Sequence, residues 1–250
     1  MLRFLLVVLI CAFIFVIFGI PVMLIGLITG LFSKELRSKI VFYYLRYCMR
    51  AIIWASGVEL TVLGLENIPD GTVFYVSNHR GIFDILTGYQ FIKPLCGTVS
   101  KKEWGQIPCL HGLMYFLNCV FLDRHSSRAG LRVIDEVARK LNEGISFWIC
   151  PEGTRSHSQT LLPFHAGSFR PAFMTGTPIV PITFVGTDDV FENHKPRICK
   201  THVTVHFGEA ITVEGLDHSE QHQLVQKIRQ QIQDTYDSIT LKDVQNELKA

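Results

Sequence analysis

A histidine and an aspartate five residues apart, His79 and Asp84, have the types and spacing needed for proton transfer. They follow a short apolar run at residues 72–76, which predicts a buried strand. Gly81 is expected to let the backbone turn sharply between them. An aspartate that holds one ring N–H fixes the histidine tautomer and leaves the other nitrogen free to accept a proton. The pattern therefore predicts a general base, with an ordinary surface turn as the alternative.

Further clusters of polar residues stand at the ends of later apolar runs. They are Asp123 and Arg124 after residues 120–122, and Glu152, Gly153, Thr154 and Arg155 after residues 145–150. Ligands bind beyond the carboxyl ends of strands in a parallel sheet, so we expect these clusters to share one site with His79. Pro181 lies within another run and lacks an N–H, which predicts an edge strand or a bulge there.

The elements that must position these side chains alternate along the chain. Strands are predicted at residues 59–65, 72–76, 97–100, 120–122, 146–150, 179–184 and 202–207. Helices are predicted at residues 85–91, 110–117, 127–142, 168–175 and 219–237. This order predicts an α/β fold with a mainly parallel, mixed sheet flanked by helices. We assign it to a domain at residues 58–250 that ends in a polar helix.

The first 57 residues are expected to anchor the chain to a membrane. Residues 2–32 form an apolar run with a single charge, Arg3, and about 20 such residues cross a hydrocarbon core. Gly19, Ile20 and Pro21 interrupt the run, so it predicts either a kinked transmembrane helix, which we favour slightly, or two helices that dip into one leaflet. A signal peptide is disfavoured because no small-residue cleavage site follows, and a buried core helix is the remaining alternative.

Basic residues follow the apolar run and set its expected orientation. They are Lys34, Arg37, Lys39, Arg46 and Arg50, opposed by Glu35 alone. Such an excess marks the cytoplasmic flank and attracts anionic head groups, so we expect the catalytic domain on the cytoplasmic side of an inner or cytoplasmic membrane. Residues 38–56 predict an amphipathic helix. Its apolar face is expected to hold Ile40, Tyr43, Tyr44, Cys48 and Ile52.

Composition and motif content exclude several classes of protein. The formal net charge of +2 is too small to indicate nucleic-acid binding. Seven irregularly spaced cysteines without a C-x-x-C pair predict free thiols in a reducing compartment and no thiolate zinc site. Neither nucleotide-binding glycine motif is present, and no G-x-S-x-G sequence supplies a serine nucleophile.

A histidine base without a protein nucleophile must activate a hydroxyl group of the substrate or a water molecule. Arg124 and Arg155 offer planar guanidinium groups that match a phosphate, and Lys101 adds a further positive charge. Beside a membrane anchor, these residues predict the transfer of an acyl group to the hydroxyl of a phosphate-bearing lipid.

Four motifs over about residues 60–215 resemble, in order, those of the glycerolipid acyltransferase superfamily. They are Asn78-His79-x-x-x-x-Asp84, Phe121-Leu122-Asp123-Arg124, Pro151-Glu152-Gly153-Thr154-Arg155-Ser156 and Val180-Pro181-Ile182. The chain length and the third motif are most similar to those of the branch that acylates lysophosphatidic acid.

The resemblance implies a role for each motif. His79, oriented by Asp84, would deprotonate the 2-hydroxyl of lysophosphatidic acid, which attacks the thioester of acyl-CoA or acyl carrier protein and gives phosphatidic acid. No metal or bound cofactor is implied. The acceptor is expected to be bound by Asn78, Lys101, Asp123, Arg124, Glu152, Gly153, Thr154 and Arg155, with Pro181 beside the acyl pocket. Backbone N–H groups near residues 78–81 are the candidates for holding the oxyanion.

Three alternatives remain beside this interpretation. The superfamily commonly has basic residues where this chain has His165 and Ala166, so the acceptor can be another lysophospholipid or lipid. A non-catalytic lipid-binding module is disfavoured because it has no use for the His79–Asp84 pair. A histidine–aspartate metal hydrolase is disfavoured because no second histidine or acid stands at ligand spacing near His79.

Overall fold

The computed structural model describes residues 1–123 and 127–247. One seven-stranded sheet has the order β1-β7-β6-β2-β5-β3-β4. Its strands are β1 (Glu59–Leu63), β2 (Phe74–Ser77), β3 (Cys96–Lys101), β4 (Val120–Leu122), β5 (Ser146–Ile149), β6 (Ile179–Val185) and β7 (His202–Phe207). Neighbouring strands run parallel except β6 and β7, which are antiparallel. The predicted mainly parallel, mixed α/β sheet is confirmed.

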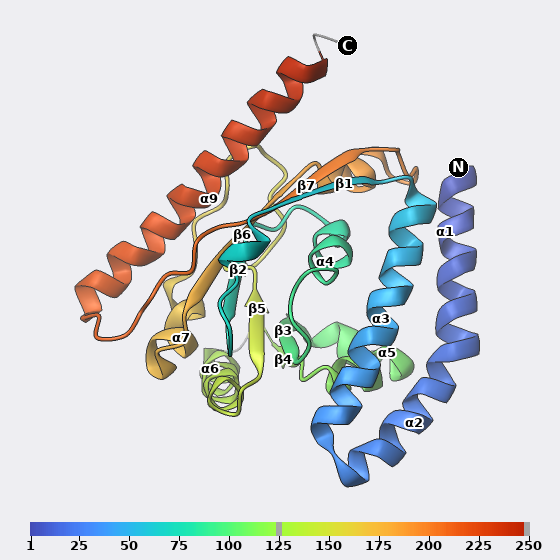
Figure 1. Ribbon diagram of the computed structural model, residues 1–250, viewed down its shortest axis with the longest axis horizontal. Helices are drawn as coiled ribbons and strands as arrows, with labels where there is room; N and C mark the ends of the chain where they lie inside the picture. Colours follow the sequence, from blue (N-terminus) through green and yellow to red (C-terminus); the bar gives the residue numbers. More distant parts are fainter. Residues whose placement is uncertain (124–126, 248–250) are drawn as a thin grey trace.

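The sheet has helices on both faces (Figure 1). On one face, α3 (Lys34–Ser56), α4 (Ile82–Gly88) and α5 (Pro108–Phe116) pack over a core that includes Tyr75, Trp148 and Phe184. On the other face, α6 (Ser127–Asn142), α7 (Arg170–Thr175) and α9 (His218–Glu247) cover a core that includes Phe74 and Phe147. Because both faces are covered, the central strands β2, β5 and β6 are buried along their whole length.

The strand that contains Pro181 lies inside the sheet, so the prediction of an edge strand is wrong. β6 is hydrogen-bonded to β2 on one side and β7 on the other. The antiparallel ladder with β7 begins only at Ile182, and the Pro181 carbonyl accepts a hydrogen bond from the Gly208 N–H at 2.8 Å. The N–H that proline lacks would point to this same side, just beyond the paired residues. An interior strand therefore accommodates Pro181 at the end of one ladder.

The apolar N-terminal run folds as two helices. α1 (Leu2–Phe13) passes through a π-helical turn (Ile14–Phe18) into α2 (Gly19–Phe32), and this bent arm lies beside α3 (Figure 1). The π-helical turn precedes Pro21, whose missing N–H removes one helical hydrogen bond at this point. Within residues 1–123 and 127–247, no helix combines the length and hydropathy needed to cross a membrane, so the slightly favoured single span is not observed.

Helix α3 joins the N-terminal arm to the sheet. Ser33 caps its first turn by accepting a hydrogen bond from the Leu36 N–H at 3.1 Å, and Gly57 ends it in the left-handed conformation. Its buried side includes Val41, Phe42, Leu45, Cys48 and Ile52, whereas Tyr43 is 46% exposed. The predicted apolar face is therefore confirmed at Cys48 and Ile52 and wrong at Tyr43, which is replaced on the buried side by Val41, Phe42 and Leu45.

Candidate active site

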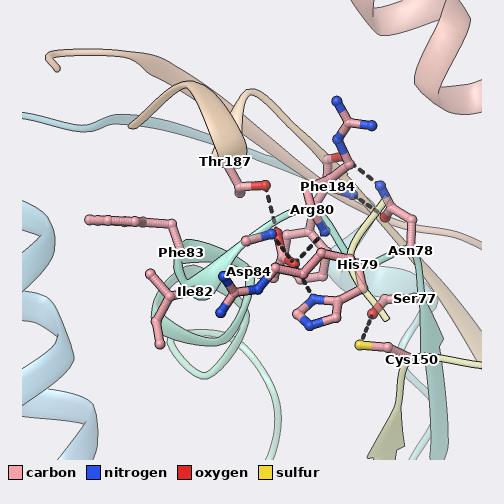
Figure 2. Close-up of polar contacts among 12 residues, drawn as sticks. Ser77, Asn78, His79, Arg80, Ile82, Phe83, Asp84, Cys150, Phe184 and Thr187 are labelled. Atoms are coloured by element: carbon pink, nitrogen blue, oxygen red, sulfur yellow. Dashed lines mark hydrogen bonds and ion pairs between the residues drawn. The ribbon is translucent and has the colours of Figure 1, made fainter. Parts of the chain in front are cut away.

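His79 and Asp84 meet just beyond the end of β2 (Figure 2). His79 Nδ1 lies 2.8 Å from Asp84 Oδ2; the His79 side chain is 22% exposed, whereas Asp84 is fully buried. The same carboxylate accepts hydrogen bonds from the Arg80 and Gly81 N–H groups and from the Thr187 hydroxyl. A carboxylate surrounded by donors accepts from the ring as well, so Nδ1 carries the proton. His79 Nε2 is thereby left to take a proton from a substrate.

Gly81 serves a purpose that differs from the predicted sharp turn. Its φ of −165° and ψ of −173° describe extended backbone that any residue adopts. A Cβ at this position would instead overlap the Glu192 carboxylate. The glycine is needed because a second carboxylate lies directly against the turn between His79 and Asp84.

Glu152 connects the third motif to the same turn. One of its carboxylate oxygens accepts from the His79 N–H at 2.7 Å and the other accepts from the Leu162 N–H at 2.8 Å. Burial raises the pKa of Glu152, although both N–H donors favour its charged form. The Ser156 N–H also donates to the His79 carbonyl at 2.8 Å. Glu152 therefore shapes the site by holding the backbone of the base.

The backbone N–H groups of residues 79–82 are already engaged, so the expected role in holding the oxyanion is wrong for those of residues 79–81. His79 donates to Glu152, Arg80 and Gly81 donate to Asp84, and the Ile82 N–H donates to Glu192 at 2.9 Å. Three carboxylates thus take up four successive N–H groups and leave none of the four for a ligand.

Asn78 is fully buried and joins the catalytic turn to β6. Its amide nitrogen donates to the Phe184 carbonyl at 2.9 Å, and its amide oxygen accepts from the Phe184 N–H at 2.8 Å (Figure 2). Both polar atoms of the amide are thus occupied by the backbone of the neighbouring strand. Asn78 was predicted to bind the acceptor. Its contacts instead fix the position of the backbone that leads into His79, so it can affect the acceptor only through that residue.

This contact predicts that Asn78→Ala destabilises the fold. The substitution leaves the Phe184 N–H and carbonyl unpaired inside the protein, and each unpaired group costs about 1–3 kcal/mol. We expect the free energy of unfolding, measured by urea denaturation, to fall by about 2–5 kcal/mol. Asn142→Ala, at an exposed asparagine that ends α6, is the matched control. An equal effect in both variants would contradict the assigned contact.

Arg155, from the third motif, is paired with a residue that the sequence analysis missed. Its Nη1 lies 3.2 Å from Glu192 Oε1; the Arg155 side chain is 34% exposed, and that of Glu192 is 2% exposed. Glu192 Oε1 is also the acceptor for the Ile82 N–H, at the start of α4. The guanidinium group is therefore held at the edge of the catalytic turn with part of its surface open to solvent.

Arg80 connects the turn between His79 and Asp84 to three other segments of the chain. Its guanidinium pairs with Asp188 Oδ2 at 2.6 Å, contacts the Ser158 carbonyl and lies 5.2 Å from the centre of the Tyr236 ring on α9. Burial works to lower the pKa of Arg80, but the contact with Asp188, together with the charges of Tyr236 and Asp84, outweighs it and the pKa is raised. The ion pair is almost completely buried, so it holds the turn rigidly.

Helix α9 also holds the loop that carries the third motif. Arg229 Nε donates to the Leu162 carbonyl at 3.0 Å. The Leu161 N–H donates to the Gln233 side-chain oxygen at 2.8 Å. Since Leu162 is also a partner of Glu152, α9 is connected to the base through three successive hydrogen bonds, from Arg229 through Leu162 and Glu152.

Of the other predicted site residues, Lys101 and Asp123 lie farther from His79. The sheet order places β3 and β4 two and three strands from β2, or roughly 10 and 15 Å away. Lys101 ends β3 and is exposed; Asp123 follows β4 and pairs with Lys102 at 2.6 Å. Thr154 is exposed, Gly153 has a φ of +70° beside the His165 ring, and Pro181 pairs with Val76. Arg124 lies outside the described residues.

The residues missed by the sequence analysis follow β6. Thr187 and Asp188 belong to α8 (Thr187–Val190), and Glu192 comes just after it. These three side chains contact Asp84, Arg80 and Arg155. The available signal was their position, since polar residues directly after a buried parallel strand lie at the same edge as His79.

Comparisons with known proteins agree with this geometry. A family model described as Acyltransferase matches residues 59–185. The 1-acyl-sn-glycerol-3-phosphate acyltransferase of Borreliella burgdorferi is 29% identical over 196 residues, which are 78% of each chain. The human 1-acyl-sn-glycerol-3-phosphate acyltransferase alpha is 28% identical over 189 residues, which are 74% of this chain and 66% of that one.

A solved structure extends the similarity to nearly the whole chain. The crystal structure of the 1-acyl-sn-glycerophosphate (LPA) acyltransferase PlsC from Thermotoga maritima superposes with a TM-score of 0.80 and 26% sequence identity. The match covers 96% of this chain and 95% of that one. The family segment spans just over half of the chain and contains His79, Asp84, Glu152 and Arg155. The chain therefore belongs to the acyltransferase family.

Proposed function

We propose that this enzyme transfers a fatty acyl group from a thioester to the 2-hydroxyl of lysophosphatidic acid, which gives phosphatidic acid for phospholipid synthesis. The contact of His79 with a buried, fully hydrogen-bonded Asp84 carries the proposal, because it prepares Nε2 as a base. The names of the similar proteins, which include 1-acyl-sn-glycerol-3-phosphate acyltransferases from several organisms, support the choice of acceptor.

The reaction needs two proton transfers at His79 Nε2. The base removes the proton of the acceptor hydroxyl while the oxygen attacks the thioester carbonyl carbon. Collapse of the tetrahedral intermediate breaks the carbon–sulfur bond, and the imidazolium returns its proton to the departing thiolate. Asp84 stabilises the imidazolium between these steps. Such a base contributes about 10²–10⁴-fold to the rate.

In this proposal the phosphate of the acceptor is held by Arg155. This arginine is partly exposed and lies beside the first turn of α4, close in the fold to the base. Lys101 and Asp123 lie at the ends of strands farther along the same edge, where they would meet more distant parts of the two substrates. The proposal involves no metal or resident cofactor.

The direct test supplies the purified protein with lysophosphatidic acid and either acyl-CoA or acyl carrier protein, and measures thiol release and phosphatidic acid. Transfer with one of the donors is the expected result. Parallel assays with lysophosphatidylcholine, lysophosphatidylethanolamine and monoacylglycerol test the alternative acceptors. Preference for any of these would replace the proposed acceptor, and absence of transfer to every acceptor would support a non-catalytic lipid-binding module.

The role of Arg155 predicts a specific kinetic change. Arg155→Lys keeps a charge opposite buried Glu192 but loses the planar guanidinium, and Arg155→Ala loses both. A charge-assisted hydrogen bond contributes about 1.5–3 kcal/mol, so the alanine variant should raise the KM for lysophosphatidic acid about 10–100-fold. Steady-state kinetics should show a smaller change in the KM for the thioester. Arg139→Ala, at an exposed ion pair on α6, is the control; an unchanged acceptor KM in Arg155→Ala would exclude the phosphate contact.

The N-terminal helices supply the proposed membrane attachment, with the catalytic domain on the cytoplasmic side. Their outward side is apolar. The exposed residues on it include Leu2, Leu5, Leu9, Phe13, Ile20, Leu24, Leu27, Ile28, Leu31 and Phe32. Exposed apolar residues along both helices suit helices that lie in one leaflet. Flotation of the protein with anionic vesicles tests this attachment, and failure to float at low salt would oppose it.

A further inference from the structure

Glu192 occupies a position between the arginine and the base. Its Oε1 accepts the Ile82 N–H at 2.9 Å and pairs with Arg155 Nη1 at 3.2 Å. Ile82 begins α4, the helix whose first turn contains Asp84. One carboxylate oxygen therefore contacts both the arginine that is proposed to bind phosphate and the segment that orients His79.

The environment of Glu192 keeps this carboxylate in one place. Its side chain is 2% exposed, and Oε2 is buried without a hydrogen-bond partner among the described residues. An unpaired buried oxygen is unfavourable. The packing that holds the carboxylate here must therefore serve something other than a hydrogen bond to Oε2. Gly81 supplies part of that packing, because its extended backbone needs no glycine and only the contact with Glu192 excludes a side chain.

We propose that Glu192 is a positioning residue that sets the place of the Arg155 guanidinium relative to the His79–Asp84 pair. The inference rests on the proposed function, because it assigns to Arg155 the phosphate of the acceptor. In a lysolipid the phosphate and the 2-hydroxyl are a short, fixed number of bonds apart. A guanidinium held at a set position from the base therefore aligns that hydroxyl with His79 Nε2. Misplacement by about 1 Å is enough to slow such a reaction substantially.

A double-mutant cycle with Glu192→Gln and Arg155→Ala tests this assignment. Glutamine keeps the shape and can still accept the Ile82 N–H, but it loses the charge that holds Arg155. With lysophosphatidic acid, we expect Glu192→Gln to lower kcat/KM about 10-fold in the wild-type background and less than about 2-fold in the Arg155→Ala background. A loss of folded protein would instead lower kcat/KM equally in the two backgrounds, and the KM for the thioester should stay unchanged in both.

Asp189→Asn is the matched control, because it removes a carboxylate from the same segment. Asp189 is exposed and contacts Asn193 at 2.8 Å, away from the base. If Glu192→Gln folds poorly, Gly81→Ala gives a second test, since its methyl group displaces the Glu192 carboxylate. It should lower kcat/KM in the wild-type background and have little further effect in a Glu192→Ala background.

Each result has one reading. Equal losses for Glu192→Gln with and without Arg155 would overturn the proposal and leave Glu192 a support of the fold. An unchanged or increased kcat/KM would overturn it as well, because Glu192 would then compete with the phosphate for Arg155. If the wild-type enzyme transfers no acyl group to lysophosphatidic acid, the proposed function fails and this inference fails with it. Normal wild-type activity without coupling removes the inference alone.

Discussion

His79→Ala should lower kcat for acyl transfer about 10²–10⁴-fold while the protein remains folded. The rate falls because the substitution removes the imidazole that takes the proton of the acceptor hydroxyl in the proposed reaction. The fold is retained because Asp84 keeps its three other donors, the Arg80 and Gly81 N–H groups and the Thr187 hydroxyl. Single-turnover transfer measures the rate, and circular dichroism with thermal unfolding measures the fold.

The matched control for this variant is His157→Ala. His157 is exposed and belongs to the same loop as Arg155. Its substitution therefore removes an imidazole near the site without removing the base. It should retain kcat within about 2-fold, as expected for an exposed residue outside the site. A kcat for His79→Ala that equals the control value would remove the histidine from the mechanism.

Asp84→Asn has the second largest expected effect, a loss of about 10²-fold in kcat. The amide oxygen can accept from His79, Arg80 and Gly81, while the amide nitrogen faces the Thr187 hydroxyl, which is able to accept. The tautomer of His79 is therefore kept. What disappears is the negative charge that stabilises the imidazolium after proton transfer. A wrong tautomer costs about 10⁴-fold in a serine protease, so a smaller loss is expected here.

Asp189→Asn tests whether this loss comes from the position of the charge. It makes the same change in net charge on an exposed carboxylate of α8. We expect the kcat of Asp189→Asn to match the wild-type value. The free energy of unfolding of Asp84→Asn should stay within about 2 kcal/mol of that of the wild-type protein, because the four contacts are replaced. Equal kcat values for the two variants would show that Asp84 does not support the base.

Much of the fold was predictable because strand signals are local. Each of the seven predicted strands exists, with ends displaced by one or two residues at most of them. The place of β6 inside the sheet could not be deduced from Pro181. The rule that excludes proline from interior strands assumes that every N–H of such a strand is paired with a neighbour. The register of β7, set by residues more than twenty positions away, decides this point.

The part of the site that could be predicted is the part whose residues are close together in the sequence. His79 and Asp84 are five residues apart, so a turn is sufficient to bring them together. Arg80 meets Asp188, and Arg155 meets Glu192, because β6 and β5 pack on either side of β2, which no local pattern reports. Arg80, to which the sequence analysis assigned no role, is 5% exposed. Long-range burial therefore determined what was missed.

The contacts of α9 determine which fragments of this enzyme can keep the site intact. The segment that matches the acyltransferase family ends at residue 185, and α9 begins more than thirty residues later. Arg229, Gln233 and Tyr236 nevertheless brace the loop and the turn that flank the base. A fragment trimmed to the family limits would keep every motif and lose the scaffold that keeps two of them in register. Recombinant versions of this catalyst should therefore retain their C-terminal helix.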